Sequence, residues 1–164
     1  MEYSELIATR YSVRAYRPDP VEDEKLQAVL EAARLAPTAA NRQPIQLIVM
    51  HTAGREEEIG KIYRRPWFVQ APLVIAVCAI SSQAWVRESD RFNARLIDAA
   101  IVADHLILAA ANLGLAGSTH TTNHIHIEKL LESSIPVRST ALDRLYKGRI
   151  LVDYLCDCIQ PFFK

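Results

Sequence analysis

Three features of the sequence predict an α+β domain, with helices packed on a small sheet. Residues 22–36 and residues 96–113 carry apolar side chains at helical spacing. Residues 72–80 form a continuous apolar run rich in β-branched residues, which is typical of a buried strand. Segments that favour a helix also outnumber segments that favour a strand. A chain of 164 residues has the length of one domain, so residues 1–164 are expected to form a single unit.

The N-terminal part of the chain is expected to contain two helices followed by a strand. Residues 2–9 favour a short helix, and residues 10–20 favour an extended or irregular segment that ends in two prolines. The helix at 22–36 has acidic residues in its first turn, where the helix dipole favours anions, and Pro37 stops it. Its apolar face is formed by Leu26, Val29, Leu30 and Ala33. The run IQLIVMH at 45–51 predicts a strand.

The following segments are expected to place one more strand between two helices. Residues 53–63 favour a helix, and the strand at 72–80 is expected to be covered on both faces. The helix at 96–113 is apolar nearly all round, which predicts that it is buried, and Gly114 should end it. Two further elements are less well defined: a helix at 128–132, and a strand or a helix at 149–159.

Composition and charge narrow the classes of function. The 19 lysines and arginines balance the 19 aspartates and glutamates, so no global basic bias points to nucleic acid. The acidic, polar N-terminus lacks the features of a signal peptide, and the most apolar run is too short and polar for a membrane span. Three cysteines, an odd and sparse set, are typical of free thiols in a reducing compartment. We therefore expect a soluble cytoplasmic protein without a membrane or nucleic-acid partner.

The segment Arg10-Tyr11-Ser12-Val13-Arg14 has the composition of an anion site. Side chains alternate in an extended segment, so Arg10, Ser12 and Arg14 are expected to point to the same side. Two guanidinium groups with a hydroxyl between them suit a phosphate. The alternative is a solvated basic strip, because isolated arginines usually lie on surfaces.

The segment APTAANRQP at 36–44 forms a polar corner between a helix and a strand. Pro37 and Pro44 restrict the backbone, and Thr38, Asn41 and Gln43 offer short side chains that both donate and accept hydrogen bonds. Such a set suits the edge of a flat heterocycle. Taken alone, a plain helix-to-strand loop is the better interpretation, because the same residue types are common in loops.

Together and in this order, the two segments resemble the nitroreductase family of FMN-dependent oxidoreductases. The resemblance lies in RYSVRAY at 10–16 and APTAANRQP at 36–44, with Thr38 in place of a usual serine and Ile45 in place of a frequent tryptophan. Gln70-Ala71-Pro72 and the helix DAAIVADHLILAAANLGL at 98–115 are also similar to the family. The likeness covers roughly residues 3–118. It implies a nitroreductase-like fold with a small mixed or antiparallel sheet, and a homodimer built on the long helix.

The resemblance also implies a role for individual residues. Arg10, Ser12 and Arg14 would hold the phosphate and ribityl chain of FMN, with Tyr11 in contact nearby. The corner would meet the flavin of the other subunit through Pro37, Thr38, Ala39, Asn41 and Gln43. Thr119 and His120, after the long helix, would lie along the flavin ring. No metal ligand is implied.

The resemblance implies an NAD(P)H-dependent oxidoreductase activity. Hydride would pass from NAD(P)H through flavin N5 to a small electron-poor acceptor, such as a nitroaromatic or a quinone, and no side chain is expected to act as an acid or base. The alternatives are a non-catalytic flavin-binding protein, and a relic whose altered tail impairs FMN binding. The sequence does not choose between NADH and NADPH, because it has no dinucleotide fingerprint.

The chain departs from the family pattern after about residue 117. No Gly-Tyr-Pro follows, and Lys147 or Arg149 would have to replace a late basic residue that reaches the phosphate. A shifted reading frame and genuine divergence both explain such a tail. The tail also holds His120, His124, His126 and Glu128, whose alternation permits a metal site, but their spacing matches no standard signature.

Overall fold

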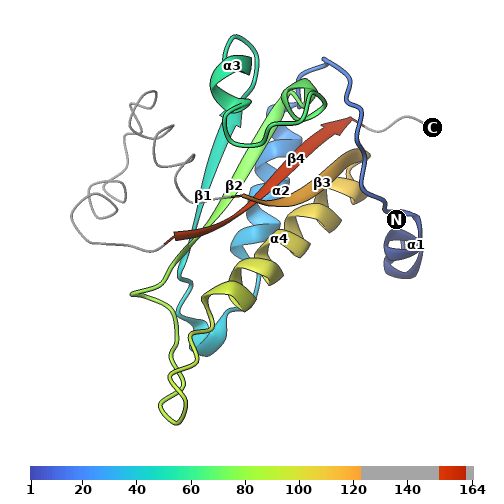
Figure 1. Ribbon diagram of the computed structural model, residues 1–164. Coiled ribbons are helices and arrows are strands. Elements are labelled where there is room, and N and C mark those ends of the chain that lie inside the picture. Colours follow the sequence, from blue (N-terminus) through green and yellow to red (C-terminus); the bar gives the residue numbers. More distant parts are fainter. Residues whose placement is uncertain (123–151, 162–164) are drawn as a thin grey trace.

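A computed structural model describes residues 1–122 and 152–161. Its sheet has four strands, in the spatial order β1-β2-β4-β3, and every neighbouring pair is antiparallel (Figure 1). The strands are β1 (Ile45–His51), β2 (Leu73–Ile80), β3 (Leu115–Thr122) and β4 (Val152–Pro161). This arrangement confirms the expected α+β class with a small sheet, and the pairings among these four strands are all antiparallel.

Two of the helices cover one face of the sheet. These are α2 (Asp23–Arg34) and α4 (Arg95–Asn112), which lie side by side behind the strands in Figure 1. The short helix α1 (Tyr3–Thr9) lies near the end of the sheet where β3 begins. Both predicted helices of the N-terminal part are therefore confirmed, with ends within two residues of the predicted ones.

Strand β2 is buried from Leu73 to Ala79, as its unbroken apolar run predicts. Ile75 and Val77 face α2 and α4 in one core cluster, whereas Val74 and Ala76 belong to a second cluster on the opposite face. Phe68 fills the second cluster together with Ile59. Because successive side chains of a strand point to opposite faces, only a strand with both faces covered can hold apolar residues at every position.

The predicted helix at 53–63 is wrong for most of its length. Only α3 (Glu56–Ile59) is α-helical, and a short 3₁₀ turn, η2 (Phe68–Gln70), follows before β2. Helix α3 ends at Ile59 because the next residue, Gly60, is a poor helix former. A turn from Tyr63 to Arg65 then changes the direction of the chain. The turns let Ile62 and Phe68 join Ile59 against β2.

Helix α4 is buried on one face only, which corrects the expectation of burial nearly all round. Leu106 is 0% exposed and packs in the core cluster of α2 and β2, whereas Leu96 is 55% and Ile97 53% exposed. Gly114 ends the helix as predicted, in a left-handed conformation with φ of 73° that glycine adopts without strain. The described residues therefore leave part of the apolar surface of α4 exposed.

The C-terminal predictions are tested only in part. Strand β4 shows that the ambiguous segment at 149–159 is a strand from Val152 onward, held between β2 and β3. The predicted helix at 128–132 lies outside the described residues. In the part of the chain that the structure describes, none of the helices has the length and apolar character needed to cross a membrane.

Candidate functional site

The N-terminal segment is held against the beginning of β3. Ser12 forms a parallel bridge with Gly117, and the backbone N–H of Val13 donates to the Gly117 carbonyl at 3.3 Å. Thr119, two residues further along β3, is partly buried. The structure thus places the segment that contains the predicted residues Ser12 and Arg14 beside β3, the strand in which Thr119 and His120 lie.

Arg14 is held by three interactions that the sequence does not reveal. Its Nη1 donates to Oγ of Ser118 at 2.5 Å and to the Val13 carbonyl at 2.9 Å. Its guanidinium carbon lies 5.0 Å from the ring centroid of Trp67, a distance at which a cation is attracted to an aromatic face. Nε and Nη2 have no hydrogen-bond partner among the described residues, so one edge of the guanidinium remains able to bind an anion.

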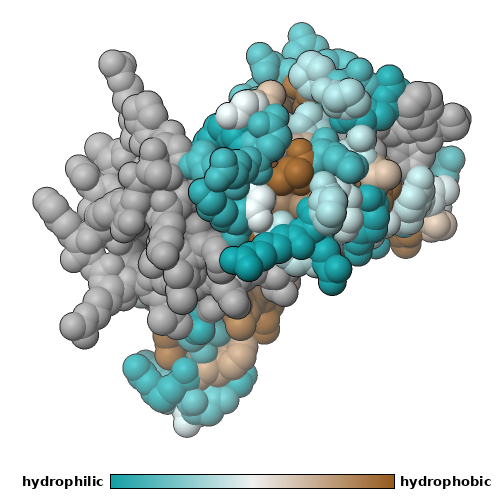
Figure 2. All heavy atoms as spheres, turned by 45° about the horizontal axis from the view of Figure 1, so that its top comes forward, coloured by the Kyte–Doolittle hydropathy of each residue, from teal (hydrophilic) through white to brown (hydrophobic). Residues whose placement is uncertain are grey.

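Trp67 belongs to an aromatic cluster beside β2. Its ring centroid lies 5.7 Å from that of Tyr63 and 6.2 Å from those of Tyr16 and Phe68. Figure 2, which turns this end of the molecule toward the reader, shows a largely hydrophilic surface around a small apolar spot. Sequence reasoning did not find Trp67, because 53 residues separate it from Arg14 and no spacing rule connects them.

The corner at 37–44 has an unusual backbone. The 3₁₀ turn η1 (Ala39–Asn41) and the following residues include three non-glycine residues with positive φ: Ala40 at 51°, Asn41 at 51° and Gln43 at 48°. Such conformations are uncommon outside glycine and cost on the order of 1 kcal/mol or more each. They persist only where the surrounding structure holds them in place, and they are found often at functional sites.

The corner is held by a buried carboxylate and by its own polar side chains. Oδ1 of Asp98, a residue 1% exposed in α4, accepts a hydrogen bond from the Ala39 N–H at 2.8 Å. Oγ1 of Thr38 accepts from the Gln43 N–H at 2.9 Å, and Nε2 of Gln43 donates to Oδ1 of Asn41 at 3.3 Å. Asp98 was not predicted as a site residue, although an acid in the first turn of an apolar helix is a visible signal.

We expect Asp98→Ala to loosen the corner. The Ala39 N–H loses its acceptor, and a hydrogen bond to a charged group contributes about 1.5–3 kcal/mol, so amide exchange in residues 38–43 should accelerate about tenfold or more. Hydrogen–deuterium exchange with mass spectrometry measures this directly. The exposed Asp104 on the same helix is the matched control, and Asp104→Ala should leave those residues unchanged. Equal protection in wild type and Asp98→Ala would contradict the role.

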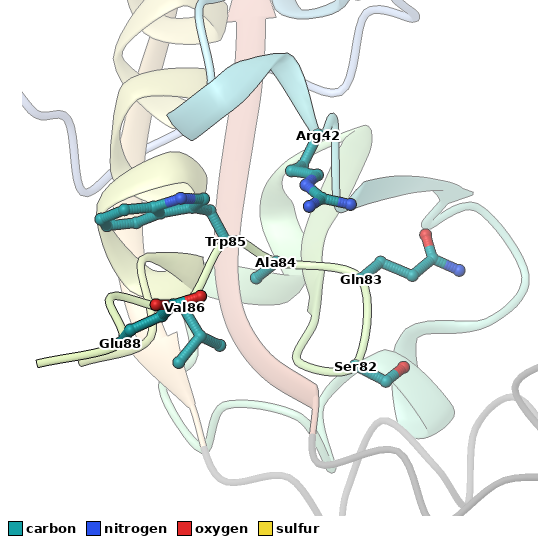
Figure 3. A pocket seen from close by; sticks show the side chains of 7 residues that line it. All are labelled: Arg42, Ser82, Gln83, Ala84, Trp85, Val86 and Glu88. Atoms are coloured by element: carbon teal, nitrogen blue, oxygen red, sulfur yellow. The ribbon is translucent and has the colours of Figure 1, made fainter. Parts of the chain in front are cut away.

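A pocket of about 790 Å³ lies next to the corner (Figure 3). Arg42 contributes one side of it, and the loop that follows β2 contributes the rest. The lining residues of the loop are Ser82, Gln83, Ala84, Trp85, Val86 and Glu88. None of these residues was singled out from the sequence for a functional role.

The two predicted halves of the flavin site lie at opposite ends of one chain (Figure 1). The corner is attached near the start of α4 through Asp98, whereas the Arg14 segment is attached to β3 just beyond the end of α4. From Asp98 to Asn112 the helix rises about 21 Å at 1.5 Å per residue. The Arg14 segment and the corner are therefore separated by most of the length of α4.

Comparison with known proteins identifies the family. A profile of the nitroreductase family matches residues 7–63. A solved structure of a nitroreductase family protein from Clostridium difficile 630 is 33% identical, with a TM-score of 0.79, and the likeness covers the whole of this chain and 86% of the other. The chain belongs to the nitroreductase family. Both predicted segments, at 10–14 and at 36–44, fall inside the matched profile.

The curated relatives of this nitroreductase-family chain are longer than it is. An FMN reductase [NAD(P)H] of Bacillus subtilis is 28% identical over 118 residues, which are 63% of this chain and 47% of the relative. An archaeal relative from Methanothermobacter thermautotrophicus, named as a possible NADH dehydrogenase or NAD(P)H nitroreductase, is 31% identical over 121 residues, or 70% of this chain and 58% of its own length. The chain thus spans about half to three fifths of these two relatives.

Most of the residues singled out in the tail after residue 117 lie outside the described part of this nitroreductase-family chain. His120 lies in β3, opposite Cys156 of β4 in the backbone register. His124, His126 and Glu128, like Lys147 and Arg149, lie outside the described residues. Within the described part of the chain, no group of three potential metal ligands comes together.

Proposed function

We propose that this chain is an FMN-dependent oxidoreductase that uses NAD(P)H to reduce a small electron-poor acceptor of nitroaromatic or quinone type. The observation that carries the proposal is that Ser118 and Trp67 hold the Arg14 guanidinium while Nε and Nη2 have no hydrogen-bond partner among the described residues. The names of the relatives, among them an FMN reductase [NAD(P)H], support the same chemistry.

The residues at the Arg14 end fit a phosphorylated cofactor. Arg14 and Arg10 supply positive charge to the phosphate, and Ser12 adds a hydroxyl donor from an exposed position. Tyr11 would contact the cofactor nearby, and Thr119 and His120 would follow the flavin ring along β3. The bridge between Ser12 and Gly117 keeps these two segments together.

The corner fits the flavin ring of a second copy. Pro37, Thr38 and Ala39 would place backbone against the ring, and the amides of Asn41 and Gln43 would meet its polar edge. The positive φ angles of Asn41 and Gln43 set the direction of the two side chains, and the hydrogen bond between their amides keeps the amides close together. Because the two halves lie at opposite ends of one chain, each site would take its Arg14 from one copy and its Asn41 from the other.

FMN, when bound, supplies the redox chemistry by accepting hydride at N5 from NAD(P)H and passing it to the acceptor. The chain itself binds the phosphate, orients the ring and excludes water from it. No side chain is required as an acid or base in this scheme. Donors at the flavin edge, such as the Asn41 amide, would stabilise negative charge on the ring.

The uncovered apolar residues near the corner support a homodimer. Leu35 is 63% exposed at the end of α2, and Leu96 and Ile97 are exposed on the first turn of α4. A second copy that covers this surface would remove apolar area from water, at about 25 cal/mol per Å². The shared site requires that this second copy also bring its own Arg14 segment to the corner.

We expect the double variant Leu96→Glu, Ile97→Glu to raise the dissociation constant of the dimer at least tenfold, because it buries two charges at the proposed interface. Sedimentation velocity across a concentration series measures the effect. Gln27→Glu with Ala28→Glu, an adjacent exposed pair on α2, is the matched control. A wild-type protein that sediments as a monomer at every concentration would contradict the dimer.

The activity is tested by the absorption spectrum of the purified protein with and without FMN. The proposal expects a yellow protein that NAD(P)H bleaches and that a quinone or a nitro compound restores. A yellow protein that neither NADH nor NADPH bleaches would indicate a flavin carrier instead. A colourless protein that takes up no added FMN would contradict the flavin site itself.

A further inference from the structure

The pocket beside the corner has a cation that nothing in the described chain neutralises. The Arg42 guanidinium forms no ion pair or hydrogen bond to the described residues. Figure 3 shows it extending between Trp85 and Gln83, over Ala84. Asn41 and Gln43, its two neighbours, bond to each other instead. Arg42 is thus available to a ligand of the pocket.

The opposite wall of the pocket is fixed by the loop that follows β2. The Trp85 carbonyl accepts from the Ala94 N–H at 2.9 Å, and Nδ2 of Asn93 donates to the Ser81 carbonyl at 3.1 Å. Arg87 pairs with Asp90 at 2.8 Å and holds the pKa of that carboxyl below its usual value. The loop therefore has defined internal contacts, and the half-buried Trp85 ring is presented to the pocket from a stable position.

The lining selects the chemistry of the ligand. Arg42 is a fork-shaped donor that matches a carboxylate or a similar planar anion. Trp85 offers an aromatic face and Ala84 an apolar floor, which suit a flat ring. Glu88 also forms no ion pair or hydrogen bond among the described residues, and it disfavours a second negative charge at its side of the pocket. The volume of about 790 Å³ lies within the range of small-molecule sites.

We propose that this pocket is a binding site for an aromatic ligand with one anionic group, in which Arg42 binds the anion and Trp85 contacts the ring. Arg42 lies between Asn41 and Gln43, so a molecule in the pocket lies next to the residues that would meet the flavin. The inference that this molecule is the electron acceptor rests on the proposed function. The enzyme would then prefer anionic aromatic acceptors over neutral ones of the same shape.

The test compares 4-nitrobenzoate with 4-nitrobenzamide, which share a ring and a nitro group and differ in charge. Binding is followed by quenching of Trp85 fluorescence in a Trp67→Phe background, because the chain has two tryptophans. We expect 4-nitrobenzoate to bind more tightly, and Arg42→Gln to raise its Kd about tenfold while the Kd of 4-nitrobenzamide changes less than twofold. Arg42→Lys should retain part of the preference, and Glu88→Gln should strengthen binding of the anion.

Arg91→Gln is the matched control, because Arg91 is an exposed arginine of the same loop that does not line the pocket. Equal binding of the two compounds, or an equal effect of Arg42→Gln on both, overturns the proposal. Because quenching needs no flavin, this failure is distinct from failure of the proposed function. In the FMN-loaded protein, Arg42→Gln could instead raise the KM for NADH and leave the KM for 4-nitrobenzoate unchanged. That result would mean that Arg42 binds a phosphate of the dinucleotide, and it would overturn the acceptor preference.

Discussion

Replacing Arg14 with alanine should weaken FMN binding about ten- to a hundredfold while riboflavin binding stays nearly unchanged. A charge-assisted hydrogen bond to phosphate contributes about 1.5–3 kcal/mol, and 1.4 kcal/mol corresponds to a factor of ten. Riboflavin has the same ring without the phosphate, so the pair of ligands separates the contact with phosphate from general damage to the site. Equilibrium titration followed by flavin fluorescence gives both constants.

Arg17→Ala is the matched control for Arg14→Ala. Arg17 lies three residues further along the same segment and pairs with Asp19, so its loss should leave both flavin affinities unchanged. Trp67→Leu retains Arg14 but removes the ring beneath it, and a smaller loss of FMN affinity in the same direction is expected. An equal loss of FMN and riboflavin binding in Arg14→Ala would show that Arg14 does not contact the phosphate.

Replacing Leu106 with alanine should lower the free energy of unfolding by about 2–5 kcal/mol, because it leaves a cavity in the core between α4 and β2. Most domains have only about 5–15 kcal/mol of stability, so this loss is a large fraction of the total. Urea denaturation of the flavin-free protein, with both midpoint and slope reported, measures it.

Leu96→Ala provides the same substitution on the same helix at an exposed position. In a single chain it should change stability by less than about 0.5 kcal/mol. A cost that grows with protein concentration would instead report a second copy covering Leu96, as the proposed dimer requires. Equal costs for Leu106→Ala and Leu96→Ala at low concentration would contradict the division of α4 into a core face and an uncovered face.

Local patterns in the sequence predicted most of the fold. The periodic helix at 22–36, the largely apolar strand at 45–51 and the continuous apolar run at 72–80 each formed the expected element, because the apolar pattern of each segment indicates which faces are buried. The helix predicted at 53–63 was wrong for most of its length, because glycine and a turn interrupt the helix-forming residues of this segment. The segment at 149–159 fits either type of element, and β2 and β3 on its two sides determine that it is a strand.

By itself, the sequence determined the family, through residue types at two segments whose chemistry can be read without any coordinates. Only the tertiary structure decided how those residues are supported: Ser118 and Trp67 hold Arg14, and Asp98 holds Ala39, across separations of 104, 53 and 59 residues. It also placed the Arg14 segment and the corner at opposite ends of α4. Contacts between segments distant in the chain depend on how elements pack, and no local periodicity records that packing.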